Sequence, residues 1–361
     1  MKPKIVFIIN SIQQQRCLKR IEEFIAHGYE VEAYGFNRAK EIPTLPEHFR
    51  INVVGQFSNS MSYPKRLLFM YKKLRPILRQ YAHENVVFYY FLLDVAMVCR
   101  TITRKPYIYE ESDLMQTYLP SRFLCQLLNR IDRAIIRRSL LTTMTSEGFV
   151  QYHFGNNPPK NIVLVPNRLN PTVTSLSYHP SNSDIHHLRV AFVGSARYES
   201  IIRFSDAFLS AFPQHELHFY GIVNDRPEEF ERIKNTYPNV YFHGKFSNPK
   251  DLPGIYEQVD LVLATYDNRY ENVRYAEPNK LYEAAYFETP IIVSSNTFLA
   301  QKTCKMGVGF AIDPFDANAI QTFFSSLTQS QIDECVAHCK AISKSELIDH
   351  NPQLFERLPW N

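Results

Sequence analysis

Residues 5–36 read IVFIINSIQQQRCLKRIEEFIAHGYEVEAYGF. The run at 5–10 is almost wholly apolar, as in a buried strand. Residues 16–27 have the apolar spacing of a helix and end at Gly28, a residue that commonly follows a helix. A second strand is expected at 31–36. This order of strand, helix and strand predicts a parallel sheet with a right-handed crossover.

The same alternation continues along the chain. The pattern predicts further strands at 51–54, 86–90, 107–111, 141–145 and 162–166, and then at 189–193, 215–220, 240–243, 261–264, 291–294 and 309–312. Residues 171–184 are rich in Pro, Ser, Thr and Asn, which is typical of a linker. We therefore expect an α/β protein with two doubly wound, Rossmann-like domains facing a cleft, the first at 1–170 and the second at 171–344.

Two local features refine this expectation. The final segment, 345–361, should pack back on the first domain because its apolar side chains need a surface to cover. The helix expected at 64–81 contains Pro76, which should kink or interrupt it.

Composition excludes several classes of protein. Glycine is scarce, with 11 in 361 residues, and neither Gly-x-Gly-x-x-Gly nor Gly-x4-Gly-Lys-Ser/Thr occurs. No apolar stretch of about 18 residues is present, so we expect no transmembrane helix. The apolar run near the start is too short for a secretory signal. The six cysteines form no Cys-x-x-Cys, which favours free thiols and a cytoplasmic location.

Charge is distributed unevenly. Residues 1–170 hold 24 Lys and Arg against 13 Asp and Glu, a net +11, whereas residues 171–361 hold 16 against 23, a net −7. Two helices of the first half carry basic faces: Lys65, Arg66, Lys72, Lys73, Arg75 and Arg79 on one, and Arg122, Arg130, Arg133 and Arg137 on the other. One helix with a basic face is usually explained by contact of that face with solvent. Two such helices in the same half of the chain favour binding to an anionic membrane surface. Nucleic acid is the competing partner, but no nucleic-acid-binding motif is present.

Residues 277–294, EPNKLYEAAYFETPIIVS, resemble the donor-binding segment of the GT-B glycosyltransferases of family 4, the group 1-like enzymes of bacterial surface polysaccharide assembly. Weaker matches follow in the expected order, at Gly194 with Arg197 and at Tyr109–Leu114. The chain departs from the family at Tyr275, where many members have the first of two glutamates. Glu283 matches the second.

This resemblance implies a nucleotide-sugar donor site in the second domain. Gly194, Arg197 and Lys280 would contact the diphosphate, and a helix N-terminus would add partial positive charge. Because two fixed cations can stabilise a leaving phosphate and no Asp-x-Asp occurs in the expected loops, we expect no metal there and no cofactor besides the donor. Glu283 would bind the ribose diol and Glu277 the sugar.

The first domain would bind a glycan or lipid-linked acceptor. Glu110, Glu111 and Asp113 follow a predicted strand, and Glu111 and Asp113 are the expected catalytic carboxylates. Asp94 and Arg16 are weaker candidates. The resemblance implies glycosyl transfer with retention, in capsule or other polysaccharide biosynthesis. The basic helices predict that this cytoplasmic enzyme is peripheral on the inner face of the plasma membrane. A nucleotide-sugar epimerase of the same fold and a non-catalytic glycan-binding protein are the alternatives.

Overall fold

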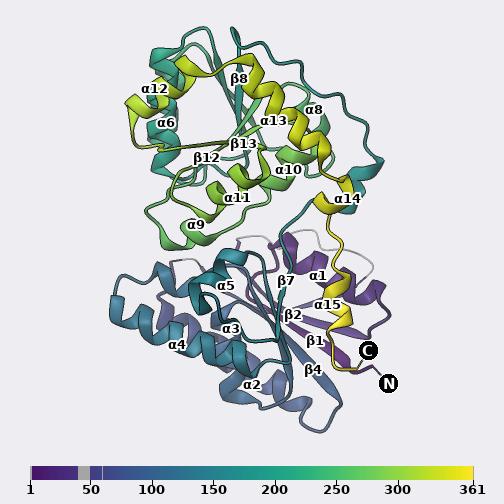
Figure 1. Cartoon of the computed structure of the whole chain (residues 1–361). Helices are drawn as coiled ribbons and strands as arrows, with labels where there is room; N and C mark the ends of the chain where they lie inside the picture. Colours follow the sequence, from purple (N-terminus) through teal and green to yellow (C-terminus); the bar gives the residue numbers. More distant parts are fainter. Residues whose placement is uncertain (1, 40–48, 59, 361) are drawn as a thin grey trace. The chain divides into compact units, whose positions relative to one another are not determined.

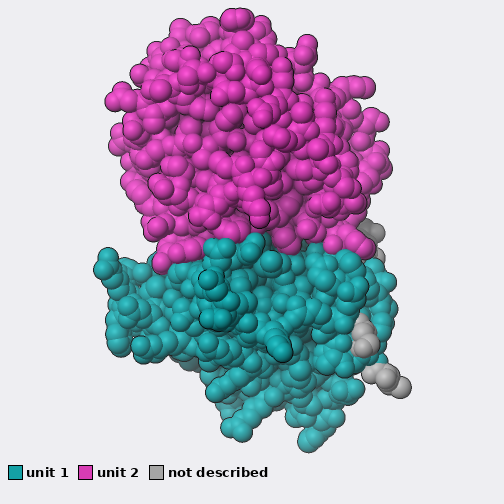
Figure 2. All heavy atoms as spheres, viewed as in Figure 1, with its two compact units in different colours: residues 1–165, 351–361 teal, residues 166–350 magenta. Residues whose placement is uncertain are grey.

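The computed structural model describes residues 2–39, 49–58 and 60–360. It contains two compact units: unit 1 comprises residues 1–165 and 351–361, and unit 2 comprises residues 166–350 (Figure 2). The chain therefore crosses between units at 165–166 and 350–351, against the expected 170–171 and 344–345. The segment expected as a linker packs on unit 2, because Val173 is fully buried in its core and Tyr178 donates a hydrogen bond to the Tyr286 carbonyl at 3.1 Å.

Unit 1 is built on a seven-stranded sheet in which all neighbouring strands are parallel. The strands are β1 (Lys4–Ile9), β2 (Val31–Asn37), β3 (Ile51–Gln56), β4 (Val86–Phe91), β5 (Tyr107–Glu111), β6 (Leu141–Met144) and β7 (Ile162–Leu164). Their order is β3-β2-β1-β4-β5-β6-β7. Ile5 of β1 lies opposite both Val31 and Val87, so β1 is an interior strand of the sheet.

Helices cover both faces of this sheet. They are α1 (Gln15–Ala26), α2 (Tyr63–Gln80), α3 (Leu93–Ile102), α4 (Arg122–Arg138), α5 (Glu147–Phe154) and α15 (Pro352–Glu356), with a 3-10 turn, η1, at Met115–Tyr118. Figure 1 shows α2, α3 and α4 on one side of the sheet and α1 and α15 on the other. Pro76 was expected to kink or interrupt this helix, and it does not interrupt α2, since the helix runs to Gln80. Pro76 is exposed, so the carbonyl that loses its partner can face water.

Unit 2 repeats this architecture with six parallel strands. They are β8 (Arg189–Val193), β9 (Glu216–Tyr220), β10 (Val240–Gly244), β11 (Leu261–Ala264), β12 (Ile291–Ser294) and β13 (Gly309–Ile312), in the order β10-β9-β8-β11-β12-β13. The helices are α6 (Glu199–Ala211), α7 (Pro227–Thr236), α8 (Leu252–Tyr256), α9 (Glu271–Tyr275), α10 (Lys280–Tyr286), α11 (Phe298–Met306), α12 (Ala317–Ser326), α13 (Gln329–Ala341) and α14 (Lys344–Leu347), with a 3-10 turn, η2, at Pro171–Ser175.

The prediction of two doubly wound, Rossmann-like domains is confirmed. In each sheet the chain builds outward from its first strand and then returns to that strand's other side, between β1 and β4 in unit 1 and between β8 and β11 in unit 2. Open sheets of this kind bind ligands beyond the carboxyl ends of the strands at the point where the order reverses. In the described residues, no helix combines the length and the apolar character needed to cross a membrane.

The C-terminal segment closes the α1 face of unit 1. Leu354, Phe355 and Leu358 are buried in the same apolar cluster as Phe24. The ring of Phe355 lies 5.0 Å from that of Phe24 and stacks on His27 at 3.5 Å. Trp360 donates a hydrogen bond to the Tyr29 hydroxyl at 3.0 Å, which fastens the end of the chain.

Replacing this buried ring should destabilise unit 1. Phe355→Ala should cost about 3–5 kcal/mol, since the ring's contacts are lost and a cavity remains. The matched control is Phe123→Ala, the same change at a side chain that is 73% exposed, which should change stability by under about 0.5 kcal/mol. Thermal unfolding of the full chain measures both, and equal shifts in Tm would contradict the packing described for α15.

Candidate functional site

Three glycines shape the carboxyl edge of the unit 2 sheet. Gly194, Gly221 and Gly244 follow or end β8, β9 and β10, and all have positive φ. The Gly194 amide donates to the Tyr220 carbonyl at 2.7 Å, and a Cβ on Gly221 would lie 1.8 Å from the Gly194 oxygen. Only glycine fits at 221. A Cβ on Gly194 would lie 3.6 Å from Lys280 Cε, so this loop and the start of α10 are in contact.

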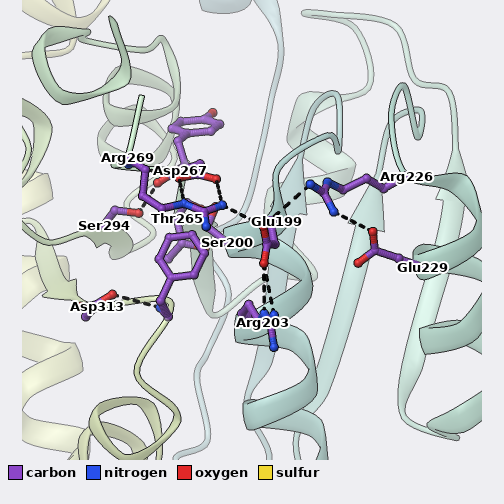
Figure 3. A network of polar contacts seen from close by, with 12 residues as sticks. Glu199, Ser200, Arg203, Arg226, Glu229, Thr265, Asp267, Arg269, Ser294 and Asp313 are labelled. Atoms are coloured by element: carbon purple, nitrogen blue, oxygen red, sulfur yellow. Dashed lines mark hydrogen bonds and ion pairs between the residues drawn. The ribbon is translucent and has the colours of Figure 1, made fainter. Parts of the chain in front are cut away.

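A network of charged side chains holds the ends of β8 and β11 together (Figure 3). Arg269 donates to Asp267 Oδ2 at 2.7 Å and to Glu199 Oε2 at 2.8 Å. Arg203 also donates to Glu199, and these two guanidiniums hold the pKa of its carboxyl below the usual range. Ser200 donates to the Thr265 carbonyl at 2.7 Å. The network therefore fixes the loop that carries Arg197.

Lys280 and Glu283 form a buried ion pair in the first turn of α10. The side chain of Lys280 is 6% exposed and that of Glu283 is 2% exposed, and Nζ contacts Oε2 directly. The spacing of three residues places both on one side of the helix. An i,i+3 ion pair is thus present at the position where the donor phosphate was expected.

Glu283 accepts hydrogen bonds on both oxygens. Oε1 accepts from the Asn248 amide at 3.2 Å and from the Asn279 amide, and Oε2 accepts from the Tyr256 hydroxyl at 3.4 Å and from Lys280. A carboxylate offers about four acceptor positions, so these donors occupy its capacity. A ribose diol could bind Glu283 only by displacing some of them.

Glu277 and Arg197 have contrasting environments. Glu277 is buried and accepts from Lys302 at 2.5 Å and from the Tyr282 hydroxyl, so its carboxylate is held between α10 and α11. Arg197 is exposed, with its guanidinium 4.8 Å from the Tyr198 ring centroid. Burial raises the pKa of Tyr266, and both Glu283 and Arg197 act on that hydroxyl.

A second polar cluster lies where the strand order reverses in unit 1. Asn10 follows β1, and Asp94 lies just beyond β4 at the start of α3. Both are 1% exposed. Arg66 Nε lies 3.9 Å from Asp94 Oδ2. Burial raises the pKa of Asp94, while Arg66 and Arg38 oppose that shift. The Asn10 side chain forms no hydrogen bond of normal geometry among the described residues, although it lies near enough to Asp94 to lower the pKa of that carboxyl.

Arg16 and Glu110 belong to an interior network rather than to an open surface. Glu110 is fully buried and accepts from Arg20 Nε at 3.1 Å and from the Tyr89 hydroxyl at 2.5 Å. Arg16 Nε lies 3.5 Å from Glu110 Oε1. The Arg16 side chain is 19% exposed, so its charge faces Glu110 more than solvent.

The expectation that Glu111 is a catalytic carboxylate requires correction. Its side chain is fully buried and lies 2.8 Å from His153 Nε2, so it cannot contact a substrate in this arrangement. Burial raises the pKa of Glu111 to about 8 and lowers that of His153 to about 4. Asp113, two residues later, is partly exposed and retains access to solvent. The sequence pattern could not distinguish these two residues, because both lie at the carboxyl end of the same strand.

Sequence reasoning missed Asn10, Arg38, Asn248 and Tyr256 as polar groups of these sites. Asn10 had a usable signal, since it ends the apolar run of the first strand at the expected carboxyl edge. Asn248, in the loop after β10, and Tyr256, at the end of α8, are brought to Glu283 only by the fold, so their role in this site could not be read from the sequence.

Residues 187–329 match the family model described as glycosyl transferases group 1. The succinoglycan biosynthesis protein ExoL of Rhizobium meliloti (strain 1021) is 23% identical over 240 residues, which cover 62% of this chain and 58% of ExoL. The chain therefore matches little more than half the length of that curated relative.

Solved structures with the same fold match nearly the whole chain. HepE of Anabaena, in complex with UDP-glucose, has a TM-score of 0.72 with 17% identity and covers 100% of both chains. Sucrose-phosphate synthase of Thermosynechococcus elongatus has a TM-score of 0.69 with 16% identity, covering 98% of this chain and 99% of that one. WaaG, a glycosyltransferase involved in lipopolysaccharide biosynthesis, has a TM-score of 0.64 with 16% identity over 99% of this chain and 100% of its own.

These likenesses confirm the resemblance drawn from residues 277–294. The match to the group 1 glycosyl transferase model over residues 187–329 includes the whole of this segment, and the similar solved structures share the fold of both units.

Proposed function

We propose that this chain transfers a sugar from a nucleotide-sugar donor to a glycan or lipid-linked acceptor in bacterial polysaccharide assembly. The observation that carries the proposal is the buried Lys280–Glu283 pair beside the Gly194 loop, at the carboxyl edge where the unit 2 strand order reverses. HepE binds UDP-glucose, so a UDP-sugar is the first donor to test. ExoL and WaaG are named for succinoglycan and lipopolysaccharide biosynthesis, which supports a surface-polysaccharide acceptor, including capsule.

On binding, the diphosphate of the donor would replace Glu283 as the partner of Lys280. A phosphate oxygen that binds the Lys280 amino group draws it from Glu283 Oε2, and that oxygen is then available to a ribose hydroxyl. Arg197 supplies a second cation from the opposite loop. Since two fixed cations and the α10 N-terminus offset the leaving charge, the reaction needs no divalent ion at the diphosphate. Transfer with retention rests on the family resemblance.

The acceptor side would use the polar edge of unit 1. Asp94 with Arg66 and Asn10 forms a polar cluster where the strand order reverses, and Asp113 lies at the end of the neighbouring β5. A carboxylate there can orient an acceptor hydroxyl. An epimerase of the same fold and a glycan-binding protein without turnover remain the alternatives. Product analysis separates them: a new glycosidic bond, an isomerised sugar nucleotide, or binding alone.

Removing the buried cation should weaken donor binding. Lys280→Ala should raise the Kd for UDP about 10- to 100-fold, because a lost charge-assisted bond costs about 1.5–3 kcal/mol. Glu283→Gln should weaken UDP binding while leaving free-sugar binding unchanged. Lys234→Ala, at an exposed lysine of α7, is the matched control and should bind UDP as the native chain does. Calorimetry measures all three, and normal UDP binding by Lys280→Ala would remove the donor-site assignment.

Donor binding should not depend on a divalent ion. The Kd for UDP should be the same with and without added Mg²⁺, because the two side-chain cations already neutralise the diphosphate. Tightening of about tenfold or more on adding Mg²⁺ would show that the diphosphate binds through a metal ion.

We also propose that unit 1 binds reversibly to an anionic membrane. Five of the six basic residues named on α2 are exposed: Lys65, Lys72, Lys73, Arg75 and Arg79. Arg66 is the exception, since its side chain is 11% exposed and faces Asp94. On α4, Arg122, Arg130 and Arg137 are exposed, whereas Arg133 is partly buried and donates to the Tyr152 carbonyl. Both helices lie on one side of the sheet (Figure 1).

The start of α4 adds an apolar contribution to this surface. Phe123 is 73% exposed, Leu124 45% and Leu127 42%, and Tyr118 of η1 is 51% exposed. Apolar side chains beside arginines are typical of helices that lie in a membrane interface. The basic residues would supply attraction to anionic headgroups, and the apolar ones would supply burial.

Vesicle binding should require both charge and low salt. The chain should co-sediment with phosphatidylglycerol vesicles at low salt, dissociate at high salt and ignore phosphatidylcholine vesicles. Reversing Lys65, Lys72 and Lys73 to Glu should weaken binding at least about a hundredfold, at about 1 kcal/mol per residue. The same variant should bind UDP normally. Equal binding to both kinds of vesicle, or none to either, would leave α2 and α4 as solvated faces.

A further inference from the structure

A cluster of three ionisable side chains lies in the interior of unit 1. Glu111 ends β5, Asp132 lies in α4 and His153 lies near the end of α5. All three side chains are 0% exposed. His153 Nε2 lies 2.8 Å from Glu111 Oε1 and 3.7 Å from Asp132 Oδ2, and each residue offers a ligand atom within 4.8 Å of the other two. The cluster thus joins three separate elements.

The two carboxylates of this cluster lack a cationic side chain. In the described part of the chain, neither Glu111 nor Asp132 forms an ion pair with Lys or Arg. Arg133, the next residue on α4, donates instead to the Tyr152 carbonyl at 3.5 Å. Two fully buried carboxylates are very costly unless positive charge accompanies them. That charge must come from protons or from a bound cation.

Several polar atoms of the cluster also lack a hydrogen-bond partner. Glu111 Oε2, Asp132 Oδ2 and His153 Nδ1 are buried and have no hydrogen-bond partner of normal geometry among the described residues. The carboxyls of Glu111 and Asp132 nevertheless lie close enough for each to shift the pKa of the other through a hydrogen bond. The other oxygen of Asp132, Oδ1, accepts from the Tyr109 hydroxyl at 3.0 Å. Tyr109 therefore orients Asp132 so that Oδ2 is the oxygen directed to His153. Such support of a ligand by a neighbouring hydrogen bond is typical of metal sites.

The spacing of these atoms suits a small divalent ion. An ion about 2.0–2.2 Å from each nitrogen or oxygen ligand requires ligand atoms roughly 3–3.5 Å apart, which the observed 2.8 and 3.7 Å bracket. Glu111 can supply both oxygens and so complete four ligand atoms. A nitrogen ligand among carboxylates favours Zn²⁺ or a similar transition metal over Mg²⁺ or Ca²⁺.

We propose that Glu111, Asp132 and His153 bind one Zn²⁺-class ion that fastens α4 and α5 to β5. The role is structural, since the complete burial of all three side chains leaves no access for a substrate. The ion would enter during folding, when the ligands are still open. It is separate from the donor diphosphate, which binds residues of unit 2, so the proposal does not depend on the chemistry of transfer.

The test measures metal in the full chain without any substrate. Protein expressed in zinc-supplemented medium and desalted should hold one equivalent of zinc by elemental analysis. Protein unfolded with chelator and refolded with Co²⁺ should show the visible absorption of a four-coordinate site. Refolding with Zn²⁺ should raise Tm above that of metal-free protein, because an ion that binds only the folded state stabilises it.

Matched variants show which side chains hold the ion. Asp132→Asn and His153→Gln nearly preserve volume and should lose the zinc, while His338→Gln, at an exposed histidine of α13, should retain it. If both cluster variants fail to fold, the native chain refolded with Co²⁺ still decides. Native protein without stoichiometric metal, and with the same Tm after refolding with or without Zn²⁺, would overturn the proposal and assign the charge to shared protons. Retention of zinc by Asp132→Asn and His153→Gln would also overturn it.

Discussion

All strands in both sheets run parallel to their neighbours, and the rest of the structure follows from this constraint. A parallel pair cannot be joined by a tight turn, so each connection crosses a face of the sheet, and helices cover both faces. The strands must then be apolar on both sides, as β4 is along its whole length. In the interior strands β1, β4, β8 and β11, charged side chains are accordingly absent except at the strand ends, as at Lys4 and Arg189. At one edge of each sheet, where the strand order reverses, polar side chains collect into a site.

The two edges differ in how they balance their charges. At the edge of unit 2, Lys280 and Glu283 neutralise each other, and Arg269 joins Glu199 and Asp267 in a network around the Gly194 loop. At the edge of unit 1, Asp94 faces Arg66 only at 3.9 Å. The first edge is already neutral and closely packed, so an anionic ligand would have to exchange with existing partners. At the second edge, the side-chain amide of Asn10 and the Nε of Arg66 lack a hydrogen-bond partner of normal geometry among the described residues.

Burial separates structural carboxylates from those that can contact a ligand. Glu110 and Glu111 are adjacent on β5 and point to opposite faces of the sheet, as successive strand residues must. Glu110 meets Arg20 and Tyr89, while Glu111 meets His153. Both are enclosed. Asp113 lies beyond the strand and is partly exposed, so within this acidic run it is the residue with access to solvent.

The sequence by itself determined the strands and their direction. Continuous apolar runs separated by helical spacing required parallel sheets, and the predicted strands of the second half agree with β8 to β13 to within a residue at each end. It also located the segment 277–294, because the pattern is local. Tertiary structure alone decided which charges are available. Arg66 was placed on a solvated face by its spacing, yet it faces Asp94 from another element. The position of Glu111 at the end of a strand predicts a site residue. In the structure it is buried like a core residue, because α4 and α5 place Asp132 and His153 against it. Local periodicity fixes secondary structure, whereas the partner and exposure of a charge depend on residues distant in sequence.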